Sequence, residues 1–161
     1  MILERPAIPE DRCAIEALVD AAYRHYIERI GTTPGPILDI AEGNYARAIE
    51  AGNITLLVER SEAGHDPGDR LAGLLVLKPQ ADSMLLDNVA VAPAFQGRGI
   101  GRRLMQLAER RARALGLDAI TLYTQVKMHE NREIYRRYGY LEMHRATERG
   151  LERVYLRKAL T

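Results

Sequence analysis

The chain has 161 residues, of which 47% are hydrophobic and 28% are charged, and this length predicts one globular domain spanning residues 1–161. Lys and Arg (23) nearly balance Asp and Glu (22), so the formal net charge of +1 argues against a protein that coats nucleic acid. No apolar run approaches the ~18 residues that span a bilayer, so we expect no membrane partner.

The cysteine and histidine content argues against disulfides and metals. Cys13 is the one cysteine of the chain, so no intramolecular disulfide can form, and the first residues lack the basic and then apolar pattern of a secretion signal. We therefore expect a cytoplasmic protein. The four histidines show no paired ligand spacing, so we expect no metal site.

The first 51 residues predict one strand followed by two helices. An extended segment at 2–5 precedes apolar residues at helical spacing, which predict an amphipathic helix over 15–26 that stops near Gly31. The glycine- and proline-rich stretch 31–36 is predicted to be a loop, and a weaker helical pattern covers 39–51.

Three apolar and partly β-branched segments follow, at 54–60, 71–77 and 84–91, and they predict an antiparallel meander. A polar loop over 61–70 and a turn over 78–82 connect them. The remaining patterns predict two further helices and three further strands. They are a helix at 101–115, a strand at 119–124, a helix at 130–138 and a strand pair at 140–144 and 153–156. This order indicates a mixed α/β sheet.

A glycine-rich turn joins the strand at 84–91 to the helix at 101–115. Glycines at 97, 99 and 101 let the main chain approach a ligand closely, so several N–H groups at the helix start can converge on a phosphate. A P-loop would need Lys-Ser or Lys-Thr where the chain has Arg102-Arg103, which excludes that motif. A dinucleotide fingerprint would need glycine in place of Arg102 and a βαβ unit, so it fits poorly.

A third motif fits. Gln96-x-x-Gly99-x-Gly101, preceded by Val-Ala-Val-Ala-Pro at 89–93, resembles the acetyl-CoA-binding signature of the GCN5-related N-acetyltransferase superfamily. The segment 131–140, with a tyrosine four residues before a Gly-Tyr pair, is similar to a later helix of that family. The resemblance implies a mixed central sheet of about seven strands with four helices, splayed at the strand that binds the cofactor.

The resemblance also implies acetyl-CoA as cosubstrate, without a metal. The residues expected to bind it are Val89, Ala90, Val91, Gln96, Gly97, Arg98, Gly99, Ile100, Gly101, Arg102 and Asn131. The main-chain N–H groups from Gln96 to Arg102 would hold the pyrophosphate. A main-chain N–H near Val91 would stabilise the developing oxyanion. Asn131 could instead be a helix-start residue.

Tyr135 occupies the position of the family's general acid, which protonates the departing sulfur. A phenol pKa of ~10 keeps such a group protonated at neutral pH. The alternative is a core aromatic, the role that we expect for Tyr138 and Tyr140. The general base is left open among a water chain and five residues, namely Asp87, Asn88, His25, Glu28 and His129.

The acceptor is expected to be a primary amine, either on a small molecule or at a peptide N-terminus. By resemblance, Tyr23, Tyr26 and the loop 31–36 would line its site, although both tyrosines also suit the core. Cys13 is interpreted as structural, which favours direct transfer in a ternary complex over an acyl-enzyme. Edge strands could support a homodimer.

Two other functions compete with this interpretation. The same fold could serve as a non-catalytic acyl-CoA-binding or regulatory domain. The arginines between 98 and 113 suggest a nucleic-acid-binding module as the second alternative, although the chain lacks a recognition motif with stacking aromatics.

Overall fold

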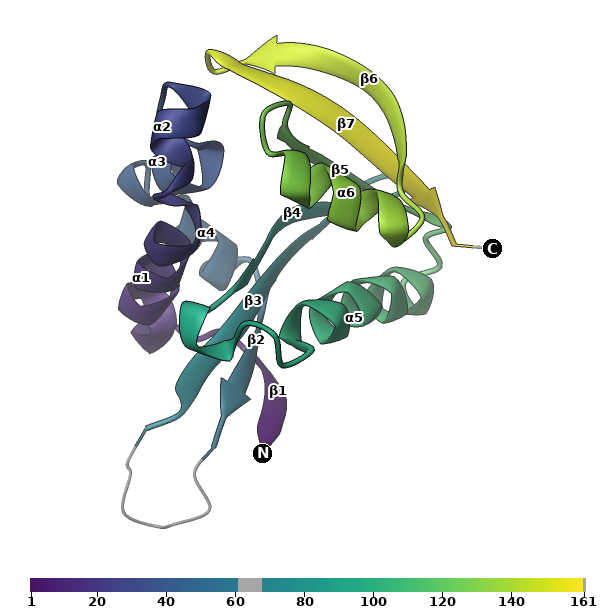
Figure 1. The fold of residues 1–161 in the computed structure, drawn as a ribbon. Helices are drawn as coiled ribbons and strands as arrows, with labels where there is room; N and C mark the ends of the chain where they lie inside the picture. Colours follow the sequence, from purple (N-terminus) through teal and green to yellow (C-terminus); the bar gives the residue numbers. More distant parts are fainter. Residues whose placement is uncertain (61–67, 161) are drawn as a thin grey trace.

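The computed structural model describes residues 1–60 and 68–160, which form a seven-stranded mixed sheet (Figure 1). The strand order is β1-β2-β3-β4-β5-β7-β6, and neighbouring strands are antiparallel except β4 and β5. The strands are β1 Ile2–Pro6, β2 Ile54–Glu59, β3 Arg70–Pro79, β4 Met84–Val91, β5 Ala119–Gln125, β6 Leu141–Glu148 and β7 Leu151–Ala159. The predicted fold class is therefore confirmed.

Helices cover both faces of the sheet (Figure 1): α1 to α4 lie on one face, and α5 and α6 on the other. They are α1 Arg12–Tyr23, α2 Tyr26–Ile30, α3 Gly35–Ala41, α4 Asn44–Glu50, α5 Ile100–Ala114 and α6 His129–Arg137, with short 3-10 turns at Pro9–Asp11 and Pro93–Phe95. Within the described ranges, no helix is long and apolar enough to cross a membrane.

The expected number of four helices is wrong, because each of the two expected N-terminal helices is divided. The first breaks after Tyr23, where Ile27 N–H donates to Arg24 O (3.1 Å) in a tighter turn. The second is divided by Gly43, whose φ of 70° is left-handed and ends the helical hydrogen bonding. Gly35 and Pro36, expected in a loop, begin α3, because proline suits a first helical turn.

The strands agree better with their predictions. The meander β2-β3-β4 is antiparallel, and β4 has the predicted bounds. β6 and β7 are longer than expected, because a tight turn at Arg149 and Gly150 (φ 54° and 74°) lets the two strands pair up to the turn. Of the expected loop 61–70, residues 61–67 lie outside the described residues.

β4 is the strand at which the sheet opens. Val76 pairs with Asn88 and Leu77 with Leu86, so the register leaves one extra residue, Asp87, on β4. This bulge changes the face that β4 presents: Leu86 packs in the core beneath α5, whereas Ala90 packs in the core beneath α1.

The second neighbour of β4 is lost at the same point. β5 pairs only with the first part of β4, from Met84 to Leu86. Residues 88–91 are therefore paired with β3 alone and leave a gap between β4 and β5. This gap is the splay that the family resemblance implied.

Candidate active site

A groove runs along the free edge of β4 to the start of α5. All but two of the expected cofactor-binding residues line it. They are Val89, Ala90, Val91, Gln96, Gly97, Gly99, Ile100, Gly101 and Asn131. The exceptions are two arginine side chains: Arg98 donates to Glu59 (2.9 Å), and Arg102 is exposed. Any part that these two play in the groove rests on their main-chain groups.

The glycine turn provides main-chain donors at one end of this groove. Gly97 and Gly99 both have a φ of 78°, a left-handed conformation that favours glycine. The first helical hydrogen bond of α5 runs from Arg103 N–H to Gly99 O (3.1 Å), so the N–H groups of 100–102 have no acceptor within the helix. Such an N-terminus attracts anions.

The free edge of β4 provides a second set of main-chain groups. Ala92 N–H donates to Ala72 O on β3 (2.8 Å), and because strand residues alternate, Val91 and Val89 point their main-chain groups towards the gap. Val89 O there lies 3.2 Å from the Tyr23 hydroxyl, whose single proton it shares with Asn88 Oδ1 (2.9 Å). The N–H of Val91 is thus directed as the expected oxyanion donor requires.

A second hollow lies between α1, α3 and the strands β4, β5 and β7. We call it the acceptor pocket because Tyr23, Gly35 and Pro36, which were expected to border the acceptor, line it. Its cavity volume is about 50 Å³, and the hollow opens to solvent. Its wall includes Asp39, Asp87, Tyr123, Gln125 and Arg153. At its α3 side, the β6–β7 turn is held by two ion pairs, from Arg149 to Asp39 (3.1 Å) and Glu42 (2.9 Å).

The groove and the acceptor pocket meet in the gap between β4 and β5. Four residues line both of them: Tyr23, Val89, Asn131 and Tyr135. Of the residues expected to border the acceptor, Tyr23, Gly35 and Pro36 line the pocket, whereas Tyr26 lines the groove. A group bound in one hollow can therefore reach a group bound in the other beside Tyr135.

Tyr135 is buried, with 9% of its surface exposed, and its ring packs edge-on against Tyr140 at 6.0 Å between centroids. Burial, and to a smaller extent the nearby Tyr26, raises the pKa of Tyr135 to about 12. The hydroxyl therefore holds its proton at neutral pH. Tyr140 is a core residue, as expected, and Tyr138 packs partly buried against the same core.

A chain of buried hydrogen bonds fixes the splayed half of β4. The Tyr23 hydroxyl donates to Asn88 Oδ1 (2.9 Å), the Asn88 amide donates to the Tyr45 hydroxyl (3.0 Å), and Tyr45 donates to Pro36 O (3.1 Å). Burial raises the pKa of Tyr23 well above its ordinary value, so this phenol stays neutral. Asn88, one of the base candidates, has a positioning role here.

The other base candidates lie in different places. Asp87 lines the acceptor pocket, where its carboxylate accepts from the Tyr123 hydroxyl (3.1 Å) and pairs with Lys78 (3.2 Å). His25 lines the groove with its ring 4.0 Å from that of Tyr26. Glu28 and His129 line neither hollow. Asp87 is thus the carboxylate among the candidates that faces the acceptor pocket.

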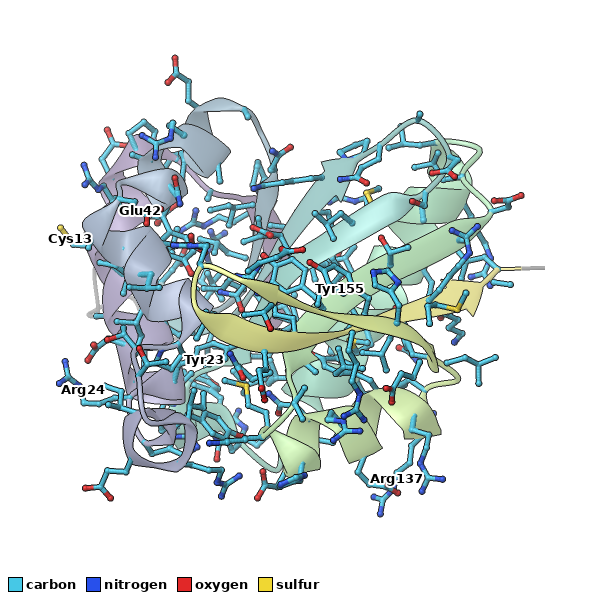
Figure 2. The ribbon with its side chains drawn as sticks, turned by 90° about the horizontal axis from the view of Figure 1, so that it is seen from above. Cys13, Tyr23, Arg24, Glu42, Arg137 and Tyr155 are labelled. Carbon is cyan, nitrogen blue, oxygen red and sulfur yellow. The ribbon has the colours of Figure 1, made fainter. Side chains whose placement is uncertain are left out.

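Asn131 and Cys13 have clear positions. α6 begins after Met128, which occupies the N-cap, so Asn131 is not the cap and its amide lies 3.6 Å from the Met128 sulfur. Cys13 is exposed, and Figure 2 shows it on the outer side of α1, pointing away from the sheet, which differs from a packed structural role. In the described part of the chain, no group of three or more His, Cys, Asp or Glu side chains could hold a metal ion.

Five polar residues of the acceptor pocket were not expected there from the sequence: Asp39, Tyr123, Thr124, Gln125 and Arg153. The alternation of inward- and outward-facing residues along β7 could have indicated Arg153. It shares a face with buried Leu151, and an arginine at a buried position is unusual. Only the register between β5 and β7 shows that Gln125 lies opposite Arg153.

Comparison with known proteins agrees with this geometry. Residues 15–140 match the model of the acetyltransferase (GNAT) family. Similar folds include a putative GNAT acetyltransferase from Desulfovibrio desulfuricans (18% identity, all of both chains, TM-score 0.74) and the ribosomal-protein-S18-alanine N-acetyltransferase from Escherichia coli (14%, 100% of this chain and 95% of that chain, 0.73). A third is the PaiA N-acetyltransferase from Thermoplasma acidophilum in complex with coenzyme A (15%, 99% of both chains, 0.73). The chain belongs to the GNAT acetyltransferase family.

Proposed function

We propose that the protein is an N-acetyltransferase that moves an acetyl group from acetyl-CoA to a primary amine by direct transfer in a ternary complex. The observation that carries this proposal is the meeting of the groove and the acceptor pocket at Tyr135. Two separate hollows that join at one protonated phenol suit two reactants that must come into contact.

The groove has the features that acetyl-CoA requires. The free N–H groups at the start of α5 suit a pyrophosphate, and the unpaired edge of β4 offers Val89 and Val91 to the amide groups of the cofactor arm. Asn131, which lines both hollows, adds a side-chain amide close to the junction. Acetyl-CoA supplies the acetyl group activated as a thioester.

Each reacting position then has a candidate group of this chain. Tyr135 holds a proton, at its raised pKa of about 12, that it can give to the departing sulfur. The Val91 N–H is directed towards the gap, where it can stabilise negative charge on the carbonyl oxygen. An alkylammonium with a pKa of ~10.4 must lose a proton before it attacks, and Asp87, directly or through water, can take it.

The position of Cys13 supports direct transfer. It is the one cysteine of the chain, and it lines neither the groove nor the acceptor pocket. Its exposed thiol points away from the gap (Figure 2), so an acyl-enzyme on Cys13 would form far from the acceptor. Transfer without a covalent enzyme intermediate needs no such group.

The nucleic-acid alternative is weakened by the partners of the basic residues. Arg98 pairs with Glu59 (2.9 Å) and Arg110 with Glu4 (2.9 Å), so acidic residues of β2 and β1 neutralise part of the arginine-rich stretch. Such partners reduce the positive potential available to a phosphate backbone.

The test is release of coenzyme A thiol from acetyl-CoA in the presence of a panel of amines, with the acetylated products identified by mass spectrometry. Amine-dependent release supports the proposal. Binding of acetyl-CoA without release to any amine would favour the acyl-CoA-binding or regulatory domain. An oligonucleotide titration at several salt concentrations checks the third possibility, because steep salt-dependent binding would support it.

A further inference from the structure

Two buried polar side chains face each other across the strands at the back of the acceptor pocket. Gln125, at the end of β5, and Arg153, on β7, are directly paired in the register, so both side chains lie on the same face of the sheet. Only 6% of Gln125 and 5% of Arg153 is exposed. Both line the acceptor pocket.

The hydrogen-bonding capacity of this pair is only partly used. One nitrogen of Arg153, Nη1, donates to Glu148 (3.0 Å), and the guanidinium stacks over the Tyr123 ring at 4.3 Å from its centroid. The other nitrogen, Nη2, and the amide nitrogen of Gln125 find no hydrogen-bond partner among the described residues. A buried donor without an acceptor is costly, so an acceptor from outside the chain would stabilise this pair.

The surrounding residues neither crowd this nitrogen nor supply it with an acceptor. A Cβ at Gly35 would lie 3.3 Å from Arg153 Nη2, so the glycine at the start of α3 keeps this nitrogen uncrowded. The acidic groups of the wall already have cations of their own, because Asp39 pairs with Arg149 and Asp87 with Lys78.

The pocket also connects this pair to the reaction centre. The ring beneath the Arg153 guanidinium belongs to Tyr123, whose hydroxyl donates to Asp87 on the splayed strand (3.1 Å). A ligand held by Arg153 therefore extends along Tyr123 towards Asp87 and the gap.

We propose that Arg153 and Gln125 bind a carboxylate of the acceptor, so that the acceptor is a small amine that carries a carboxylate, such as a free amino acid. Carboxylate oxygens are the natural partners of an unpaired guanidinium N–H and an amide N–H that lie side by side. The inference rests on the proposed acetyltransferase function and adds to it the chemical class of the acceptor.

The test compares acceptors that differ only in the carboxylate. The standard amino acids and their carboxamides are assayed with the wild-type protein and with Arg153→Met. We expect the variant to raise KM about 10- to 100-fold for the acids, with kcat and the KM for acetyl-CoA within about twofold, and to change KM for the amides by less than about twofold. Equal losses for acids and amides would reduce Arg153 to a structural role and overturn the proposal.

Two further variants control for folding and charge. Gln125→Leu removes the neighbouring amide and should raise KM for the acids several-fold without affecting the amides, so it decides the question if Arg153→Met does not fold. Arg157→Met removes an arginine on the same strand that lies outside the pocket and should leave both acceptor sets unchanged. A loss with Arg157→Met equal to that with Arg153→Met would make the effect one of general charge and contradict the proposal.

A binding measurement separates this inference from the proposed function. Calorimetric titration of the coenzyme A-bound protein with N-acetyl amino acids needs no turnover, and we expect binding that is lost with the corresponding N-acetyl amides and in Arg153→Met. If only amines that lack a carboxylate are acetylated, the carboxylate site is refuted and the proposed acetyltransferase function stands. Absence of transfer to every amine would refute the acetyltransferase, while carboxylate-dependent binding would still support the site.

Discussion

The groove and the acceptor pocket meet at Tyr135 but differ in the source of their polar groups, which are mainly main-chain groups in the groove and side chains in the pocket. Two consecutive segments, the free half of β4 and the glycine turn, form one side of the groove, and their side chains are mostly small or absent, whereas α1, α2 and α6 add larger side chains such as Tyr26 and Tyr138. The acceptor pocket is lined by large polar side chains from separated elements, including Asp39 on α3, Tyr123 on β5 and Arg153 on β7.

This difference separates two kinds of recognition. The hydrogen-bonding groups that β4 and the glycine turn offer belong to the main chain. Their positions therefore depend on the backbone conformation and not on which side chains are present. A pocket made of side chains changes with single substitutions while the sheet stays intact. Substitutions in the groove should therefore act through backbone conformation and close approach, and substitutions in the pocket through specific donors.

The largest effect is expected at the junction. Tyr135→Phe keeps the ring in the core but removes the proton donor, so kcat should fall by about 10²- to 10⁴-fold while KM for acetyl-CoA changes little. Steady-state kinetics at saturating amine measure this. An unchanged kcat would mean that water protonates the sulfur. Tyr140→Phe, which also removes a buried hydroxyl but lines neither hollow, is the matched control.

The next effect tests the wall behind the groove. A Cβ on Gly73 of β3 would lie 2.9 Å from Ile100 Cγ2 and 3.1 Å from Ala90 O, so Gly73→Ala should lower the free energy of unfolding by about 1–3 kcal/mol. Urea denaturation measures it. Gly68→Ala, where a Cβ meets nothing within 4 Å, serves as the control, and an equal loss there would contradict the packing argument.

Two glycines of the turn separate the effect of a left-handed backbone conformation from the effect of an added Cβ in the groove. Gly99→Ala should cost about 1–2 kcal/mol, because its φ of 78° is left-handed. Gly101→Ala has no such strain, and its Cβ would make an ordinary contact with Val91 (3.7 Å), so stability should be kept. If both substitutions raise KM for acetyl-CoA but only Gly99→Ala destabilises the fold, the groove is limited by close approach as well as by conformation.

A smaller effect follows from the pKa of Tyr135, which burial raises to about 12 from an ordinary value of ~10. The neutral phenol is favoured in the folded state, so its contribution to stability is complete below pH 10 and is lost as the pH rises from 10 to 12. At pH 11, the free energy of unfolding should fall by about 1 kcal/mol more in the wild type than in Tyr135→Phe. Denaturation of both proteins between pH 8 and 11 checks the sign.

The smallest effect is expected at Cys13, which lies outside both hollows. Cys13→Ser should leave kcat and both KM values within about twofold, because an exposed thiol on the outer side of α1 takes no part in direct transfer. Loss of turnover in a variant that folds normally would contradict direct transfer and require an acyl-enzyme.

The two hollows also differ in how far the sequence alone predicts them. The strand at Met84–Val91 and the turn that follows it are contiguous, so their glycine spacing indicates the groove without knowledge of the fold. The acceptor pocket depends on the register of β5 with β7, which places Gln125 opposite Arg153. It also depends on α3, whose start at Gly35 was expected to be a loop.

The extra residue on β4 has a consequence for how the active site is encoded. With strict alternation, Leu86, Asn88 and Ala90 would all face the same side, and the strand would present a single buried face along its whole length. The bulge at Asp87 reverses the parity of every position after it. Deletion or insertion of one residue here would exchange the two faces of residues 88–91, so the length of this segment determines which of its side chains and main-chain groups line the groove.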